Sequence, residues 1–110
     1  MPEPKPLVFR APARADVEAA LGWFLEEAGE QIATRFTNEL EAAYTHITSN
    51  PNTGSPRWGH TLDIPGLRHW PLKHFPYLVF FIQQHDRIEI VHILHSARAI
   101  PSTLGEPEAD

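Results

Sequence analysis

The sequence contains no cysteine among its 110 residues, and this absence removes several classes of function at once. Without thiols the chain has no cysteine nucleophile, no thiolate metal ligand and no disulfide bond. Nothing in it therefore requires an oxidising compartment, and we expect a cytoplasmic location. A hydrophobic fraction of 42% is enough for one ordinary core, so we predict a single domain that covers residues 1–110.

Long apolar runs are also missing. No segment approaches the roughly 20 consecutive apolar residues that a helix needs to cross a bilayer. The first six residues contain three prolines and lack the apolar middle region of a secretory signal. We therefore expect no membrane association, and we expect residues 1–6 and 105–110 to be flexible.

Basic residues are scarce, with 9 lysines and arginines against 14 acidic residues and a formal net charge of -5. Proteins that bind a phosphate backbone usually present an excess of positive charge, so we do not expect direct binding of nucleic acid. The seven histidines form no helical pair at metal-ligand spacing, and His92 and His95 would point to opposite faces of a regular strand. We predict no metal site and no cofactor.

Two amphipathic helices are predicted in the first half of the chain, over residues 12–27 and 32–47. Pro12 suits the first turn of a helix, Gly29 is a plausible terminator, and the second helix ends before Pro51. Apolar residues recur at helical spacing in both runs: Val17, Ala20, Leu21, Phe24 and Ala28, then Ile32, Phe36, Leu40, Ala43, Tyr44 and Ile47. Because the connection is so short, the two helices should form an antiparallel hairpin.

The remaining segments read as strands and turns. We predict a short strand at residues 7–10 and an irregular segment at 57–65. A further strand is predicted at 67–72, and its proline limits it to the edge of a sheet or to the end of a strand. Residues 77–82 are apolar on both faces and indicate a central strand, and residues 87–95 form the last strand. The tail at 99–104 either adds a short helix or trails off.

This order of elements predicts an α+β fold, in which an N-terminal strand and a helical hairpin pack on an antiparallel β-meander. The opposite face of the sheet stays an open question at this level. If residues such as Arg68, Trp70, Tyr77 or His92 project there, that face is a concave polar and aromatic surface instead of a second core.

Three segments, taken together with the helical pair, carry a resemblance to a known family. They are Gly-Leu-Arg-His-Trp-Pro-Leu-Lys at residues 66–73, Tyr-Leu-Val-Phe-Phe at residues 77–81, and the last strand with its Leu-His-x-x-Arg ending at Arg98. In this order and at these distances, they resemble the ParE branch of the RelE/ParE toxin superfamily. The resemblance extends over nearly the whole chain and implies the fold described above.

The resemblance further implies a toxin of a bacterial type II toxin-antitoxin system that a small antitoxin protein neutralises. ParE-like toxins are associated with poisoning of DNA gyrase, whereas RelE-like relatives cleave mRNA on the ribosome. A third alternative is a member of the family that has lost toxicity and only binds its antitoxin. We take gyrase poisoning as the leading hypothesis and expect no intrinsic catalytic activity.

RNA cleavage needs a base for the 2′-hydroxyl, a proton donor for the leaving oxygen, and cations that stabilise charge on phosphorus. The available candidates are few: Arg68, Lys73, His74, His92, His95 and Arg98. Of these, His95, Arg98 and Lys73 are the candidates for a catalytic role, and His95 would be the base if burial and Arg98 tune its pKa. The shortage of basic residues argues against this alternative.

We predict that a protein partner contacts Arg68, Trp70, Tyr77, His95 and Arg98. Arg98 follows the last strand, where a side chain can reach a partner while its backbone stays anchored. We expect Arg98→Ala to relieve growth inhibition with little change in the melting midpoint. Each residue also has a structural interpretation: His95 as a hydrogen-bonded strand end, Arg98 as the partner of a carboxylate, and Trp70 as packing.

Overall fold

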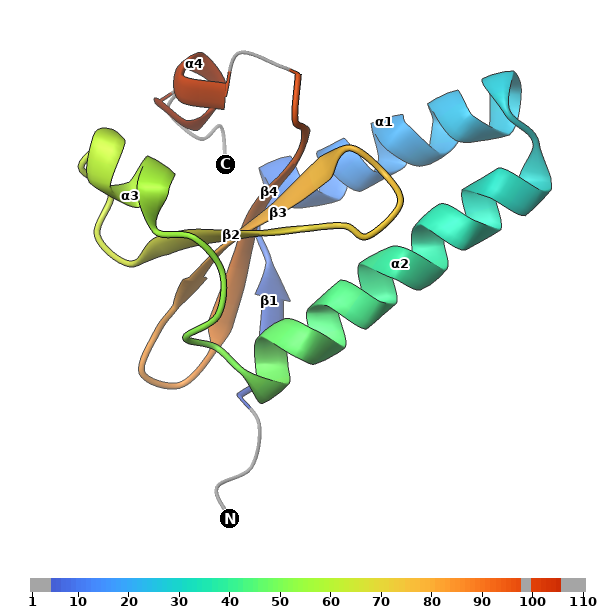
Figure 1. Ribbon diagram of the computed structural model, residues 1–110. Helices are drawn as coiled ribbons and strands as arrows, with labels where there is room; N and C mark the ends of the chain where they lie inside the picture. The colour runs from blue at the N-terminus through green and yellow to red at the C-terminus, as the bar shows by residue number, and fades with distance from the viewer. Residues whose placement is uncertain (1–4, 98–99, 106–110) are drawn as a thin grey trace.

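The computed structural model describes residues 5–97 and 100–105 of the chain (Figure 1). Along the sequence the elements are β1 (Leu7–Phe9), α1 (Ala11–Glu27), α2 (Glu30–Ser49), α3 (Arg57–Thr61), β2 (Leu67–Pro71), β3 (Tyr77–Gln83), β4 (Ile88–His95) and α4 (Ile100–Gly105). The predicted α+β fold, with its N-terminal strand and helical hairpin, is confirmed.

The four strands form one sheet in the order β1-β4-β3-β2. Strands β2, β3 and β4 are the antiparallel meander that the sequence predicts, and β2 lies at the edge. Strand β1 pairs in parallel with β4, where Leu7 is opposite Ile88 and Phe9 is opposite Ile90. Strands β1 and β4, which lie far apart in the sequence, thus pair in one sheet, and β4 and β3 are the two interior strands.

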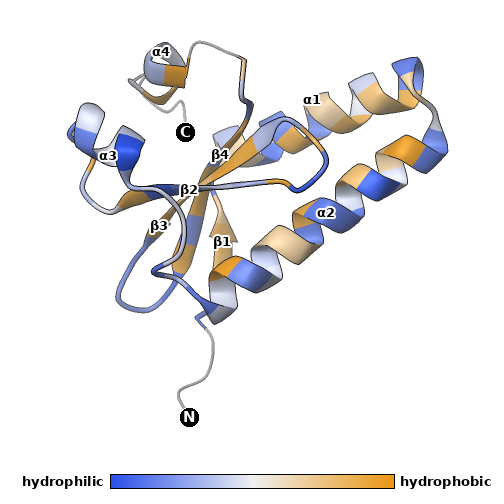
Figure 2. Cartoon of the chain, viewed as in Figure 1, coloured by the Kyte–Doolittle hydropathy of each residue, from blue (hydrophilic) through white to orange (hydrophobic). Residues whose placement is uncertain are grey.

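Helices α1 and α2 cover one face of the sheet and bury its larger cluster of apolar side chains. Figure 2 shows hydrophobic residues along the strands and alternating hydrophobic and hydrophilic bands along α2. The rings of Phe24 and Phe36 lie 4.8 Å apart, and Phe75 packs edge-on against both. These aromatic contacts hold the far end of the helical hairpin against the turn between β2 and β3.

The opposite face of the sheet is a second, smaller core. Its buried members are Leu67, Phe80, Val91, Leu94 and Ile100. Helices α3 and α4 cover this face through Trp58 and Leu104, which pack against the cluster. Our prediction of an irregular segment at residues 57–65 is therefore wrong for residues 57–61, where α3 forms.

The chain can pack α3 this closely because residue 59 is glycine. A Cβ at Gly59 would lie 2.6 Å from the carbonyl oxygen of Leu67, so only glycine allows this approach.

Trp70 and Tyr77 pack against the cluster on the helical face, not the opposite one. The concave polar surface that we considered for the opposite face is thus replaced by a core.

The two described residues before β1 form hydrogen bonds with other parts of the chain. The N–H of Ile88 donates to the carbonyl of Pro6 at 2.9 Å, which extends the pairing of β1 beyond its first residue. The Lys5 ammonium donates to the carbonyl of Gln84 at 2.7 Å. The flexibility expected for residues 1–6 and 105–110 stays a prediction, and residues 1–4 and 106–110 lie outside the described part of the chain.

Candidate partner-binding groove

A groove of about 620 Å³ opens between α1 and the adjacent ends of β3 and β4. One wall comes from α1, where Asp16, Ala20 and Trp23 are spaced so that they share one side of the helix. The Trp23 side chain is 58% exposed, and its ring lies 5.2 Å from that of Phe24, which is buried. An exposed tryptophan thus stands on the rim of an apolar groove.

The other wall comes from the strand ends and the turn between β2 and β3. Phe75 and Pro76 come from the turn, Tyr77 is the first residue of β3, and His95 is the last residue of β4. Tyr77 and His95 are register partners, and their rings meet edge-on at 5.2 Å. Two residues that the sequence predicts to contact a partner are therefore brought together in this groove.

A hydrogen bond to His95 fixes the tautomer of its neutral ring. Its Nδ1 accepts a hydrogen bond of 3.1 Å from the N–H of Ala97. Because a backbone N–H can only donate, the neutral ring carries its proton on Nε2. This leaves the Nε2–H as a donor on a ring that lines the groove.

Asp16 ties α1 to the strand below it. Its Oδ2 accepts from the Nδ1 of His92 at 2.8 Å and from the N–H of Ile93 at 2.9 Å. Strand β1 pairs with β4 only as far as Ile90, so the carboxylate satisfies a strand N–H beyond the end of that pairing. His92 is thereby part of the scaffold.

Strand β4 contains a bulge directly before His92. Phe80 pairs with His92 and Phe81 pairs with Ile90, so Val91 is an extra residue. The extra residue precedes His92, so the strand from His92 to His95 is regular, with His92 opposite Phe80 and His95 opposite Tyr77. Phe80 belongs to the smaller core and Tyr77 packs against the larger one, so the two histidines lie on opposite faces of the sheet, as the sequence predicts.

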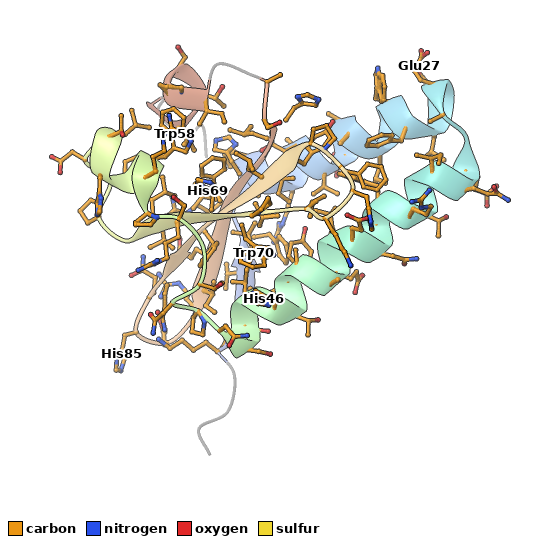
Figure 3. The ribbon with its side chains drawn as sticks, viewed as in Figure 1. Glu27, His46, Trp58, His69, Trp70 and His85 are labelled. Carbon is orange, nitrogen blue, oxygen red and sulfur yellow. The ribbon has the colours of Figure 1, made fainter. Side chains whose placement is uncertain are left out.

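Trp70 lies in a different hollow, between α2 and the edge strand β2. Its ring stacks on that of His46 at a centroid distance of 4.1 Å (Figure 3). The exposed side chain of Lys73 lines the same hollow. Trp70 and Lys73 are thus separated from the groove that holds Tyr77 and His95.

The second hollow also contains a contact between α2 and the turn that follows β2. Glu39 accepts from the backbone N–H of His74 at 2.8 Å and from its Nδ1 at 2.7 Å. Burial alone would raise the pKa of the Glu39 carboxyl, but the hydrogen bonds from His74 hold it below its usual value. The contact fixes the turn that carries Phe75 and Pro76 into the groove.

Arg68 and Arg98 are the two remaining residues that the sequence predicts to contact a partner. Arg68 donates from Nη1 to the carbonyl of Gly54 at 3.0 Å, which holds the loop after α2. Arg98 lies outside the described residues, so its predicted contacts stay predictions.

Sequence analysis did not single out Trp23. The available signal was the run of five residues without a polar side chain at 21–25, which is long enough to place apolar side chains on the outer side of a helix as well as on the core side.

Among residues 5–97 and 100–105, no group of three or more potential ligand side chains is placed to hold a metal ion. In the same part of the chain, none of the helices is long and apolar enough to span a membrane.

Comparison with known proteins identifies the class. The model of the family described as "ParE toxin of type II toxin-antitoxin system, parDE" matches residues 7–100. The chain therefore belongs to the ParE toxin family, and it is a ParE-type toxin of a type II toxin-antitoxin system.

A solved structure supports the same fold. It is described as the chromosomal ParDE TA system from P. aeruginosa, and it superposes with a TM-score of 0.70 at 20% sequence identity. The match covers 83% of this chain and 95% of that one. Among curated proteins, none matches the sequence significantly.

Proposed function

We propose that this ParE-type toxin inhibits growth by binding DNA gyrase, and that a cognate antitoxin neutralises it by occupying the groove beside α1. The observation that supports the proposal is the groove itself, which is apolar, open and bordered by the exposed ring of Trp23. Such surfaces on small proteins are typical of sites that bind other proteins. Membership of the ParE family supports gyrase as the target.

The placement of the basic residues favours protein binding over RNA cleavage. Arg68 is engaged with a loop carbonyl and His92 with a carboxylate, so both act in the scaffold. Lys73 lines the hollow beside α2, whereas His95 lines the groove beside α1. A nuclease needs an acid, a base and a cation around one phosphate, and the candidates in the described part of the chain do not gather on one surface.

Regulated expression in a bacterial host tests the target. Gyrase poisoning predicts double-strand DNA breaks that depend on gyrase and disappear in a host with a resistant enzyme. Loss of mRNA as the earliest lesion, with intact chromosomal DNA, would replace gyrase with the ribosome as target. Growth without either lesion would indicate a family member that only binds its antitoxin.

Neutralisation is tested separately by purification. The toxin is co-expressed with the small protein encoded beside its gene and passed over a gel-filtration column. We expect one hetero-oligomer and normal growth of the host. Elution of the toxin alone would contradict the proposed antitoxin.

A further inference from the structure

His69 is a half-buried histidine on β2, and one of its ring nitrogens is buried without a partner. Its Nδ1 atom has no hydrogen bond with any residue in the described part of the chain. The ring lies 5.4 Å from that of Phe80, which is fully buried in the smaller core. A neutral imidazole carries one N–H, whereas an imidazolium carries an N–H at both nitrogens. Protonation of His69 would therefore place a charged N–H where the described residues supply no acceptor.

The charges around this ring add to the cost of a proton. Burial lowers the pKa of the His69 imidazole, and the positive charge of Arg57 on α3 lowers it further. Helix α3 has one other titratable side chain, the exposed His60, and Asp63 in the turn after α3 is exposed as well. Strand β3 contributes Tyr77, which packs on the other face of the sheet. Residues 100–105 of α4 carry no ionisable side chain, so α3, β3 and α4 offer no carboxylate that could offset the proton.

The backbone of His69 is held on both sides, which prevents the strand from turning the ring out to solvent. His69 is the register partner of Phe80 in the pairing of β2 with β3. On its other side it exchanges two backbone hydrogen bonds of 3.0 Å with Ser55. The loop lies so close that a Cβ at Gly54 would be 2.5 Å from the carbonyl oxygen of His69. Relief of a charge on the ring must therefore come from the neighbouring helix α3.

Helix α3 is able to move because it is short. It has five residues, and so short a helix has little stability apart from its tertiary contacts. These contacts include Trp58, which packs against the smaller core, and Gly59, which lies against β2. The backbone N–H of Arg57 donates to Oγ of Ser55 at 3.2 Å, so the helix begins at the loop that pairs with His69. Movement of α3 would expose the ring of His69 without breaking the sheet.

We propose that His69 makes the packing of α3 sensitive to pH: the neutral ring allows α3 to stay packed on the smaller core, and protonation of the ring releases the helix. Because the pKa of His69 is lowered in the packed state, this packing is most stable above the unfolded value near 6.5 and weakens as the pH falls below it. The released state exposes Trp58 and the apolar side chains beneath it. The switch lies on the face of the sheet opposite α1 and α2, so it does not depend on the proposed function.

Amide hydrogen exchange of the full-length chain measures the release of α3. The backbone N–H groups of His60 and Leu62 report it, because they donate to the carbonyls of Pro56 and Trp58. Their protection, corrected for the intrinsic effect of pH on exchange, should fall by about threefold or more between about pH 7.5 and about pH 5.5. Protection within α2 should stay nearly constant. His69→Gln, which keeps a polar side chain that takes up no proton, should remove most of the fall in α3.

His60→Gln is the matched control, because it makes the same substitution at an exposed position of α3. It should leave the fall in protection unchanged. A fall of equal size in His69→Gln and in the unmodified chain would overturn the proposal, as would constant protection of α3 in the unmodified chain. An equal fall in α2 and α3 would also overturn it, because the whole domain would then open instead of one helix.

A second measurement needs no variant of His69 and so does not depend on whether that variant folds. In an NMR titration of the unmodified chain, the ring of His69 should have a lower midpoint than the ring of the exposed His60. The indole N–H signal of Trp58 should shift with the same midpoint as His69, whereas that of Trp23 on α1 should not. A midpoint for His69 at or above that of His60 would contradict the proposal.

Discussion

Glu89 is a buried carboxylate on the central strand, with 8% of its surface exposed. Arg10 contacts one of its oxygens at 2.7 Å and Arg87 the other at 2.8 Å. The hydrogen bond from Arg10, together with the charges of both arginines, lowers the pKa of Glu89 despite its burial. The two guanidiniums thus make this buried position compatible with a charge.

This arrangement predicts a pH-dependent contribution to stability. Because the pKa of Glu89 is lowered in the folded state, its contribution is present above the unfolded value near 4.5 and is lost as the pH falls through the folded value. Glu89→Gln should reduce the free energy of unfolding at pH 7 by roughly 1–2 kcal/mol. Urea denaturation at pH 7 and at pH 3 measures the free energy of unfolding and its dependence on pH.

The difference between the variant and the unmodified chain should shrink at pH 3, because Glu89 is then increasingly protonated in both states. Glu41→Gln, at an exposed position on α2, is the control. Parallel stability curves for the Glu89 variant and the unmodified chain would argue against the assigned role.

Alanine substitutions at two glycines should have opposite effects on the stability of the protein. Gly54 has φ 85°, and a Cβ there would lie 2.5 Å from the carbonyl oxygen of His69, whereas a Cβ at Gly22 meets nothing within 4 Å. Gly54→Ala should cost roughly 2 kcal/mol or more through strain and overlap. Gly22→Ala, in the middle of α1, should stabilise the protein by about 0.5–1 kcal/mol. Thermal melting of the two variants provides the comparison, and a loss of stability in both would be inconsistent with it.

At the scale of elements, α4 acts as a cover for the second core. Ile100 at its start is 4% exposed and packs with Phe80 and Leu94 on the face opposite the helical hairpin. A sheet with one face left open would expose these side chains to water. The short helix is therefore part of the fold's stability.

Ile100→Ala should destabilise the protein by about 2–4 kcal/mol, because it removes buried methylene groups and leaves a cavity. Ser102→Ala, at an exposed position of the same helix, should change the stability by less than about 0.5 kcal/mol. Urea denaturation measures both. A loss below about 0.5 kcal/mol for Ile100→Ala would mean that α4 does not cover the second core in solution.

At the scale of the whole molecule, a net charge of -5 and the separation of Lys73 from His95 predict the absence of ribonuclease activity. Primer extension on transcripts from expressing cells should show no cleavage above background. Discrete cleavage that is lost in His95→Ala, or in Lys73→Ala, would contradict this prediction. Melting curves of both variants check that any loss of activity is not a loss of fold.

The sequence by itself determined the order and type of most elements. Helical spacing of apolar residues predicts α1 and α2, and prolines and glycines mark their ends. The apolar run at residues 77–82 predicts the interior strand β3, and Pro71 limits β2 to a sheet edge or a strand end. These properties are local, because they depend on periodicity and backbone preference within a few residues.

Only the tertiary structure decided what depends on residues far apart in the chain. The parallel pairing of β1 with β4, the cover provided by α3 and α4, and the extra residue at Val91 have no signal within one segment. The candidate site follows the same division. The sequence motifs predict Tyr77 and His95 as partner contacts, but whether these residues line one groove with Trp23 depends on how α1 crosses the sheet. A helix period specifies which residues share a side, while packing decides which side remains open to a partner.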